Sequence, residues 1–168
     1  MHARGFTIVE LIITITIMGI LLVLTVVNVS STQVNARDTE REGDVKAIAA
    51  NLESFYSTDN SLSANLGVYP STSLPNGTVD YMQQMLRDVD IKSLRAPGVT
   101  DPKQTFIAAT NNGQTVSSVA PQPTISQYVY QPLDANGALC ASSNCRKFNI
   151  YYRLEKNNTV YMITSKNQ

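Results

Sequence analysis

The apolar residues are distributed unevenly, because a long apolar run from Phe6 to Val27 occupies the start of the chain. A helix of about 20 apolar residues covers the roughly 30 Å hydrocarbon core of a bilayer. We therefore predict a membrane-spanning helix over residues 6–29. Glu10 is the one charged residue in this run. A carboxylate at the centre of such a segment costs roughly 2.5–3.5 kcal/mol on insertion scales, which makes Glu10 a candidate functional residue.

The pattern then changes to that of an amphipathic helix between Ser30 and Tyr56, a stretch without proline. Its apolar positions recur at helical spacing: Val45, Ile48, Ala49, Leu52, Phe55 and Tyr56. The opposite face is expected to be charged, with Arg37, Asp38, Glu40, Arg41, Glu42, Asp44 and Lys46. Glu42 and Lys46 form an i,i+4 pair in the favourable order. We predict one helix from Phe6 to Ser57, about 78 Å long at 1.5 Å per residue.

Three strands are predicted near the C-terminus, over Ile125–Leu133, Arg146–Glu155 and Thr159–Ser165. The second strand alternates most clearly, with Phe148, Ile150, Tyr152 and Leu154 on one face and Asn149, Tyr151, Arg153 and Glu155 on the other. The simplest assembly is an antiparallel meander whose first face packs on the amphipathic helix and whose second face lies outward. The predicted fold class is α+β, a long N-terminal helix against a small antiparallel C-terminal sheet.

The segments between these predicted elements contain fewer patterns that predict local structure. Thr78 can cap a short helix over Val79–Asp88. Residues 110–124 consist of small and polar side chains, which predicts an exposed loop. The chain therefore divides into a leader at 1–5, an apolar helix at 6–29 and a globular head at 30–168. Arg4 before the span weakly favours a cytoplasmic N-terminus with the head on the far side.

Two interpretations of Glu10 follow from its position. Near the helix start, the carboxylate can reach the lipid headgroups and benefit from the positive end of the helix dipole. Alternatively, it needs a cation that arrives when the protein assembles. The second interpretation is favoured by the leader, Met1-His2-Ala3-Arg4-Gly5, whose polar-to-apolar boundary lies between Gly5 and Phe6. A protease that reads this boundary leaves the apolar helix on the mature protein, unlike a secretory signal peptidase.

The segment Arg4-Gly5-Phe6-Thr7-Ile8-Val9-Glu10-Leu11-Ile12 resembles the type IV prepilin signature. The resemblance implies cleavage by a membrane prepilin peptidase between Gly5 and Phe6. It also implies N-methylation of the new terminal Phe6. In that family, the glutamate five residues into the mature chain, here Glu10, neutralises the terminal amine of a neighbouring subunit. The close resemblance extends to about Leu22, and beyond that it is one of architecture.

One difference from the family lies within the apolar helix. Gly19 matches a glycine that is common in pilins, but many relatives also carry a proline at about the position of Val26 and Val27. In the family, the stretch between the two can lose its helical structure on assembly. β-Branched residues such as Val26 are mediocre helix formers, so melting of this part in a filament stays open.

Cys140 and Cys145 are the only cysteines of the chain. An even count in an extracytoplasmic domain predicts a disulfide, here one that stiffens an exposed hairpin tip. A structural zinc site needs four ligands, and the chain has no histidine after His2, so a metal site is not expected. Many pilins bracket a larger C-terminal loop with their disulfide, and the small loop here differs from that arrangement.

Catalysis has little support, because the sequence shows no nucleophile–base set and no glycine-rich phosphate loop. We expect no enzymatic activity and no cofactor. The formal net charge is zero, which argues against a strongly basic nucleic-acid binder. Basic residues do gather about the second strand, at Arg146, Lys147, Arg153 and Lys156. They are candidates for contact with DNA or an anionic host surface, although a solvated edge strand guarded by charge is the simpler interpretation.

Two functions are consistent with these observations. The first is a structural subunit of a type IV pilus that serves surface attachment, twitching motility or DNA uptake. The alternative is a low-copy minor pilin or pseudopilin that binds DNA, a receptor or a secretion substrate. Major pseudopilins of general secretion usually carry a C-terminal calcium site. Only Asp134 and Glu155 are acidic after Asp101, so the sequence shows no acidic cluster of that kind, which argues against a role in secretion.

The resemblance also implies partners and a location. The expected partners are identical or homologous pilin subunits in a helical filament, the prepilin peptidase and the inner-membrane assembly platform. The monomer is expected in the cell membrane as a single-pass protein with its N-terminus inside. After assembly, the subunit is expected in an extracellular pilus.

Overall fold

The computed structural model describes residues 5–57, 66–142 and 144–167. The chain divides into two compact units, residues 1–36 and 37–168. The long helix predicted from the sequence is present as α1, Ile8–Ser57, which contributes residues to both units. The backbone of α1 is helical through Gly19 and Gly43, so neither glycine ends it.

The second unit contains a four-stranded sheet with the order β1-β2-β3-β4. The strands are β1, Phe106–Ala108; β2, Tyr128–Leu133; β3, Lys147–Arg153; and β4, Val160–Thr164. β2, β3 and β4 form the predicted antiparallel meander. β1 was not predicted, and it pairs with β2 in parallel. The meander therefore has an additional strand that enters from the middle of the chain.

Within the described residues 66–105, four short helical segments precede β1: α2, Ser73–Asn76; α3, Val79–Met85; η1, Ile91–Leu94; and α4, Pro102–Thr105. α3 matches the short helix predicted from the sequence but ends three residues earlier, at Met85. Its predicted cap is confirmed, because the Thr78 side chain accepts a hydrogen bond from the backbone N–H of Tyr81 at 3.2 Å. Helix ends depend on such local bonds, which sequence periodicity does not report.

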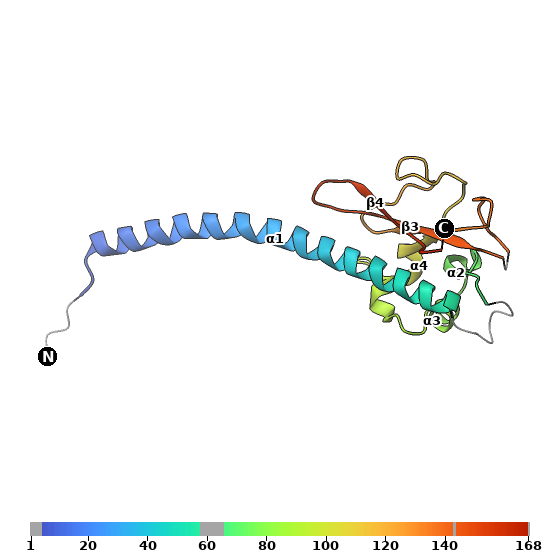
Figure 1. Cartoon of the computed structure of the whole chain (residues 1–168). Helices are drawn as coiled ribbons and strands as arrows, with labels where there is room; N and C mark the ends of the chain where they lie inside the picture. Colours follow the sequence, from blue (N-terminus) through green and yellow to red (C-terminus); the bar gives the residue numbers. More distant parts are fainter. Residues whose placement is uncertain (1–4, 58–65, 143, 168) are drawn as a thin grey trace. The chain divides into compact units, whose positions relative to one another are not determined.

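The predicted apolar face of α1 is confirmed as the centre of the core. Val45, Ile48 and Leu52 are completely buried, and they belong to one cluster with Phe148 and Ile150 of β3. Figure 1 shows strands β3 and β4, in orange and red, beside the second half of α1. Burial of these apolar side chains, each contributing about 1.5–3 kcal/mol, holds the sheet on the helix.

The other face of the sheet was expected to lie outward, and this expectation is wrong. Asn149 is 5% exposed and Tyr151 is completely buried. The connection between β1 and β2, residues 109–127, packs over this face and buries Val119 against Tyr151. Parallel strands need a long crossover between them, and here the crossover provides the cover. Residues 110–124 are thus a layer of the head, although many of their side chains remain exposed.

Hydrogen bonds make the burial of the polar residues on this face tolerable. Gln131 Oε1 accepts from Asn149 Nδ2 at 3.0 Å and from the Tyr151 hydroxyl at 2.9 Å. The Gln131 Nε2 group donates to the carbonyls of Asn111 and Gly113 in the crossover, both at 2.9 Å. A buried polar group is costly only when it lacks a partner, so this network fixes the crossover on the sheet.

The charged face of α1 is also less solvated than expected. Arg41 is 2% exposed, Asp38 6% and Asp44 8%. Arg41 Nη1 donates to Asp38 Oδ1 at 2.7 Å, and its Nε donates to the carbonyl of Ile125 in the crossover at 2.8 Å. Helical periodicity places these side chains on a polar face, but it does not reveal that other backbone segments cover that face.

The hairpin between β3 and β4 is one of those segments. Asp38 Oδ1 accepts from the backbone N–H of Glu155 at 2.8 Å, and Oδ2 accepts from that of Lys156 at 2.9 Å. The Glu155 carboxylate pairs with Arg37 at 2.6 Å and with Arg41 at 3.4 Å. We call Arg37, Asp38, Arg41 and Glu155 the arginine hub, because it joins α1, the hairpin and the crossover. The predicted Glu42–Lys46 pair, at 3.3 Å, lies outside it on the exposed surface.

Cys140 and Cys145 form the predicted disulfide. The expectation that it lies at an exposed tip is wrong, because the two residues are 3% and 0% exposed and belong to the main core. The N–H of Tyr69 donates to the carbonyl of Cys145 at 2.8 Å, and that of Thr72 donates to the carbonyl of Cys140 at 3.2 Å. These two backbone hydrogen bonds join the segment at residues 69–72 to the part of the β2–β3 connection that the disulfide closes.

Candidate assembly site

Thr7 and Glu10 form a reciprocal cap at the start of α1. The backbone N–H of Thr7 donates to Glu10 Oε2 at 3.1 Å, and the Thr7 hydroxyl donates to the same oxygen at 2.8 Å. In return, Thr7 Oγ1 accepts from the backbone N–H of Glu10 at 3.2 Å. This is the capping box in which a threonine and a glutamate three residues later satisfy the free N–H groups of a helix start.

The cap shows how the carboxylate is accommodated before any partner arrives. Both Thr7 donors bind one oxygen, Oε2, so the other oxygen is the one through which Glu10 could hold a cation. Glu10 was predicted as a functional residue, whereas Thr7 was not predicted as its partner. The signal was present in the spacing Thr-x-x-Glu just before an apolar run, which is the sequence signature of a capping box.

Gly5 and Phe6 lie immediately before the cap and outside the helix. The Phe6 side chain is 83% exposed, and no heavy atom lies within 4 Å of the position a Cβ on Gly5 would occupy. A protease must bind its substrate in an extended, accessible form. The Gly5–Phe6 peptide bond is accessible within this chain, and its cleavage stays a prediction.

The helix that follows is long and apolar enough to cross a membrane. Its large apolar side chains between Ile8 and Leu24 are between 52% and 80% exposed within this chain. The threonines of this part do not carry free hydroxyl donors: those of Thr14, Thr16 and Thr25 donate to backbone carbonyls three or four residues earlier. Such bonds satisfy a hydroxyl group in a helix surrounded by lipid or by other helices.

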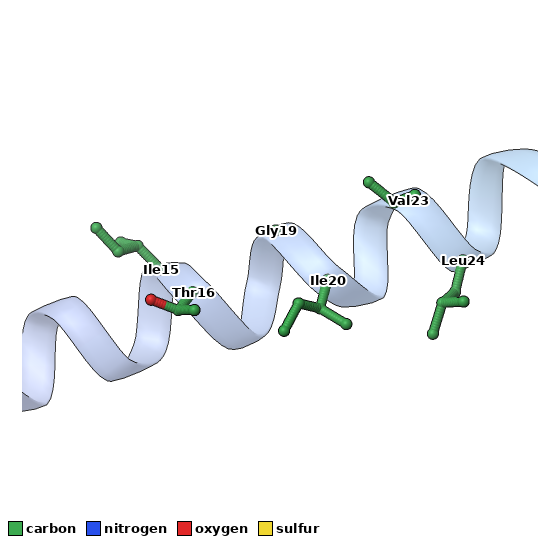
Figure 2. A pocket seen from close by; sticks show the side chains of 6 residues that line it. All are labelled: Ile15, Thr16, Gly19, Ile20, Val23 and Leu24. Carbon is green, nitrogen blue, oxygen red and sulfur yellow. The ribbon is translucent and has the colours of Figure 1, made fainter.

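A shallow apolar hollow lies on this helix around Gly19 (Figure 2). Figure 2 shows Gly19, which has no side chain, one turn from Ile15 and one turn from Val23. The hollow has a volume of about 410 Å³ and is lined by Ile15, Thr16, Gly19, Ile20, Val23 and Leu24. Glycine at this position lets another chain approach the α1 backbone closely.

The basic residues singled out in the sequence do not form one patch. Arg146 and Lys147 lie at the beginning of β3, whereas Arg153 and Lys156 lie at its end. Arg146 Nη1 donates to the carbonyl of Gly67 at 2.8 Å, and Arg153 Nε donates to that of Pro123 at 2.8 Å. β3 is also an inner strand of the sheet, so the interpretation of a charged edge strand is wrong. Contact with DNA or an anionic surface stays a prediction.

The two acidic residues near the C-terminus each have a role within the head. Asp134 Oδ1 accepts from the backbone N–H groups of Asn136 and Ala138 at 2.8 and 2.9 Å, which closes a tight turn. Glu155 belongs to the arginine hub. Among the described residues, no group of three or more His, Cys, Asp or Glu side chains is placed to hold a metal ion.

Comparisons with known proteins agree with this N-terminal arrangement. The model of the prokaryotic N-terminal methylation motif matches residues 1–26. Together with the apolar helix, the match defines a prepilin-type protein with a helix suited to membrane anchoring. No solved structure matches the chain.

A similar protein narrows the class of protein that this chain resembles. The type II secretion system core protein G of Pseudomonas aeruginosa is 43% identical over 68 residues, which are 40% of this chain and 43% of the relative. The match thus spans less than half the length of the relative. The motif and the relative together support a member of the type IV pilin and pseudopilin family.

Proposed function

We propose that the chain is a structural subunit of a type IV pilus filament, assembled through its apolar helix and serving surface attachment, twitching motility or DNA uptake. The observation that carries the proposal is the Thr7–Glu10 cap, which stands at the head of an exposed apolar helix and directly follows Gly5–Phe6. The cap supports the proposal because it holds a carboxylate in place at the start of a helix whose following residues are mostly apolar.

Cleavage after Gly5 would convert the amide nitrogen of Phe6 into a terminal amine, which is a cation at neutral pH. N-methylation, which the family resemblance implies, would leave this amine charged. A cation and a carboxylate are each costly in an apolar medium, and together they attract strongly. The Glu10 of one subunit, already oriented by Thr7, would pair with the Phe6 amine of the next. The prepilin peptidase, the membrane and the inner-membrane assembly platform are the other partners of this proposal.

Before assembly the subunit would lie in the cell membrane with its N-terminus inside, and afterwards in an extracellular filament. A pilin contributes structure and needs no active site, so we propose no enzymatic role. The half-buried Lys147 and the exposed Lys156, at opposite ends of β3, leave room for contact with DNA or a host surface.

The similarity to a type II secretion system core protein supports a second candidate, a pseudopilin or low-copy minor pilin. In that case the head would bind a secretion substrate, a receptor or DNA. Abundance separates the candidates, because a pilus subunit would make up most of the protein in filaments sheared from cells. A minor pilin or pseudopilin would be scarce or absent there, and deletion of its gene would impair secretion or assembly instead.

The main experiment exchanges Glu10 in cells that also produce the tagged wild-type chain. Glu10→Gln keeps the cap, because glutamine serves in a capping box as glutamate does, but it removes the charge. We expect both Glu10→Gln and Glu10→Ala to insert into the membrane normally and to be lost from sheared filaments. If Glu10→Gln enters filaments as the wild type does, Glu10 acts only as a cap and the proposed pairing is wrong.

Processing is measured on the same samples. Mass spectrometry of the filament protein should show a terminus at Phe6 with a methylated amine. An intact Met1 leader in filaments, or a terminus beyond the apolar helix, would contradict the proposal. Normal processing of Glu10→Gln, combined with its loss from filaments, would place the defect at assembly.

A further inference from the structure

Three segments of the chain have the Asn-x-Ser/Thr pattern in which an asparagine can accept a sugar, beginning at Asn28, Asn76 and Asn157. The pattern also arises by chance, and it acts as an acceptor where the asparagine lies in a surface loop of a head outside the cytoplasm. The structure separates the three segments by this criterion.

Two of the three segments lie in or between helices. Asn28 is part of the continuous helix α1, within the stretch expected to lie in the membrane. Asn76 is the last residue of α2, and the Thr78 hydroxyl two residues later caps α3. The N–H of Gly77 between them donates to the carbonyl of Ser73 at 2.8 Å. Because the pattern requires the hydroxyl of its third residue, a transferase would first have to open this junction of two helices.

The third segment lies at the tip of the hairpin between β3 and β4, where Asn157, Asn158 and Thr159 are all exposed. Asn157 Oδ1 accepts from the backbone N–H of Thr159 at 3.1 Å, an Asx turn that holds the amide beside the residue that carries the hydroxyl. The Thr159 hydroxyl donates to the Asn157 carbonyl at 3.3 Å. Strong O–H···O bonds are about 2.5–3.0 Å long, so little is lost when this hydroxyl is released.

We propose that Asn157 is a site of N-linked glycosylation and that the donor is a saccharide carried in the membrane on a polyprenyl diphosphate. The inference rests on the part of the proposed function that places the head outside the cytoplasm. A donor held in the membrane is available on that side, whereas soluble nucleotide sugars are made in the cytoplasm.

The transfer is a substitution at the sugar. Asn157 Nδ2 attacks C1 of the first sugar, and an N–C1 bond forms as the C1–O bond to the diphosphate breaks. The polyprenyl diphosphate leaves, and the displaced amide proton passes to a base of the transferase. The step needs no oxidant or reductant.

The surroundings of Asn157 accommodate a sugar without loss of the hairpin. Its Nδ2 donates one hydrogen to the Tyr161 hydroxyl at 3.1 Å, and a glycosylated amide keeps one N–H with which to do so. The tip itself is held by Arg153, whose Nη1 donates to the carbonyl of Asn158 at 2.7 Å. This bond uses a backbone carbonyl, so a sugar on Nδ2 replaces no bond that closes the hairpin.

The test is mass spectrometry of peptides from the full-length chain, isolated from the membranes and the filaments of the native cell. Trypsin cuts after lysine and arginine, so it releases residues 157–166, or 154–166 if the cut beside a modified residue is slow. Asn76 falls in a separate peptide, residues 47–87. We expect a saccharide mass on the peptide that contains Asn157 and none on peptide 47–87. An unmodified Asn157 peptide in both fractions overturns the inference.

Three substitutions locate the modification within that peptide. Asn157→Gln removes the acceptor and Thr159→Val removes the hydroxyl of the pattern, so each should abolish the added mass. The matched control is Asn158→Gly, which keeps the pattern and suits the positive φ of 52° at this position, and it should stay modified. If Asn157→Gln keeps the added mass, the sugar is on a hydroxyl group and the inference is wrong.

The outcomes separate this inference from the function on which it rests. Protease added to spheroplasts reports the side of the membrane on which the head lies. If the head is accessible and incorporation into filaments depends on the Glu10 charge, but Asn157 is unmodified, the glycosylation proposal alone is wrong. If the head is protected from the protease, the proposed location fails and the glycosylation proposal fails with it.

Discussion

Replacement of Arg41 should destabilise the head strongly, although the residue is one of several cations on the polar face of α1. We consider Arg41→Met, which keeps a flexible aliphatic side chain and removes the guanidinium. Arg41 is 2% exposed and contacts Asp38, Glu155 and the carbonyl of Ile125. The substitution therefore leaves a buried carboxylate and a backbone carbonyl with fewer partners.

The magnitude follows from what the partners retain. Loss of one member of a buried ion pair typically costs 3–5 kcal/mol. Asp38 keeps its two bonds from the hairpin N–H groups, and the Glu155 side chain is 26% exposed and still pairs with Arg37. We therefore expect the low end, about 3 kcal/mol, which corresponds to a Tm lower by about 10 °C for a unit of this size.

The matched control is Lys46→Met on the same helix. Lys46 pairs with Glu42 at 3.3 Å, but the two side chains are 65% and 40% exposed. Exposed i,i+4 pairs contribute about 0.3–0.5 kcal/mol, so this variant should melt within about 2 °C of the wild type. The comparison measures the effect of burial, because both changes remove one cation from α1 and introduce methionine.

The assay is thermal unfolding of the full chain in detergent micelles, followed by near-ultraviolet circular dichroism. The chain has no tryptophan, and its eight tyrosines all lie at or beyond residue 56, so the signal reports the head and not the apolar helix. If Arg41→Met costs no more than Lys46→Met, the arginine hub does not hold the hairpin and crossover on α1, and the reasoning from burial is wrong.

Three further predictions concern other parts of the chain. Burial raises the pKa of Asp44 to about 6 from an ordinary value of 3.8, so the folded head binds this proton more tightly than the unfolded chain and its stability should fall as pH rises from about 4 to 6. Asp44→Asn should flatten this decline of Tm between about pH 4 and 6, and an unchanged pH profile would contradict the prediction. Cys140→Ala with Cys145→Ala should cost about 2 kcal/mol from the short loop. Limited proteolysis should then cut first near Tyr69, because its N–H donates to the carbonyl of Cys145; cleavage confined to residues 141–144 would show that the bridge acts only locally. Thr7→Val should cost about 1 kcal/mol at the helix start, seen as faster hydrogen exchange of the first N–H groups of α1 in micelles while exchange in the head is unchanged.

Periodicity was sufficient to predict the parts of the fold that bury one apolar face. α1, the antiparallel meander and the contact between them follow from apolar spacing of 3.6 and 2 residues. β1 could not be predicted in this way, because its three residues form too short a run and its partner lies about twenty residues further along the chain. Its parallel pairing also explains why residues 109–127 form a layer and not a free loop.

The residues of the candidate site likewise divide into those that could be predicted from the sequence and those that could not. The segment from Arg4 to Ile12 resembles the type IV prepilin signature, and this resemblance predicted Gly5, Phe6 and Glu10 as site residues. The cap by Thr7 was within reach of the sequence as well, through its spacing from Glu10. The arginine hub could not be predicted from the sequence, because Asp38 and Arg41 bond to backbone groups on segments more than 80 residues away. Long-range backbone partners of this kind leave no local pattern.

The crossover over the outer sheet face has a consequence for how the head meets its surroundings. Residues 104–133 contain no lysine, arginine, aspartate or glutamate, so the layer at 109–127 presents hydroxyls, amides and small apolar groups without a formal charge. Fields from surface charges steer encounters and are screened over about 8–10 Å at physiological ionic strength. A contact made through this layer would form only at short range, and its strength would depend little on ionic strength. A contact made through Lys156 at the hairpin would instead weaken as salt is added.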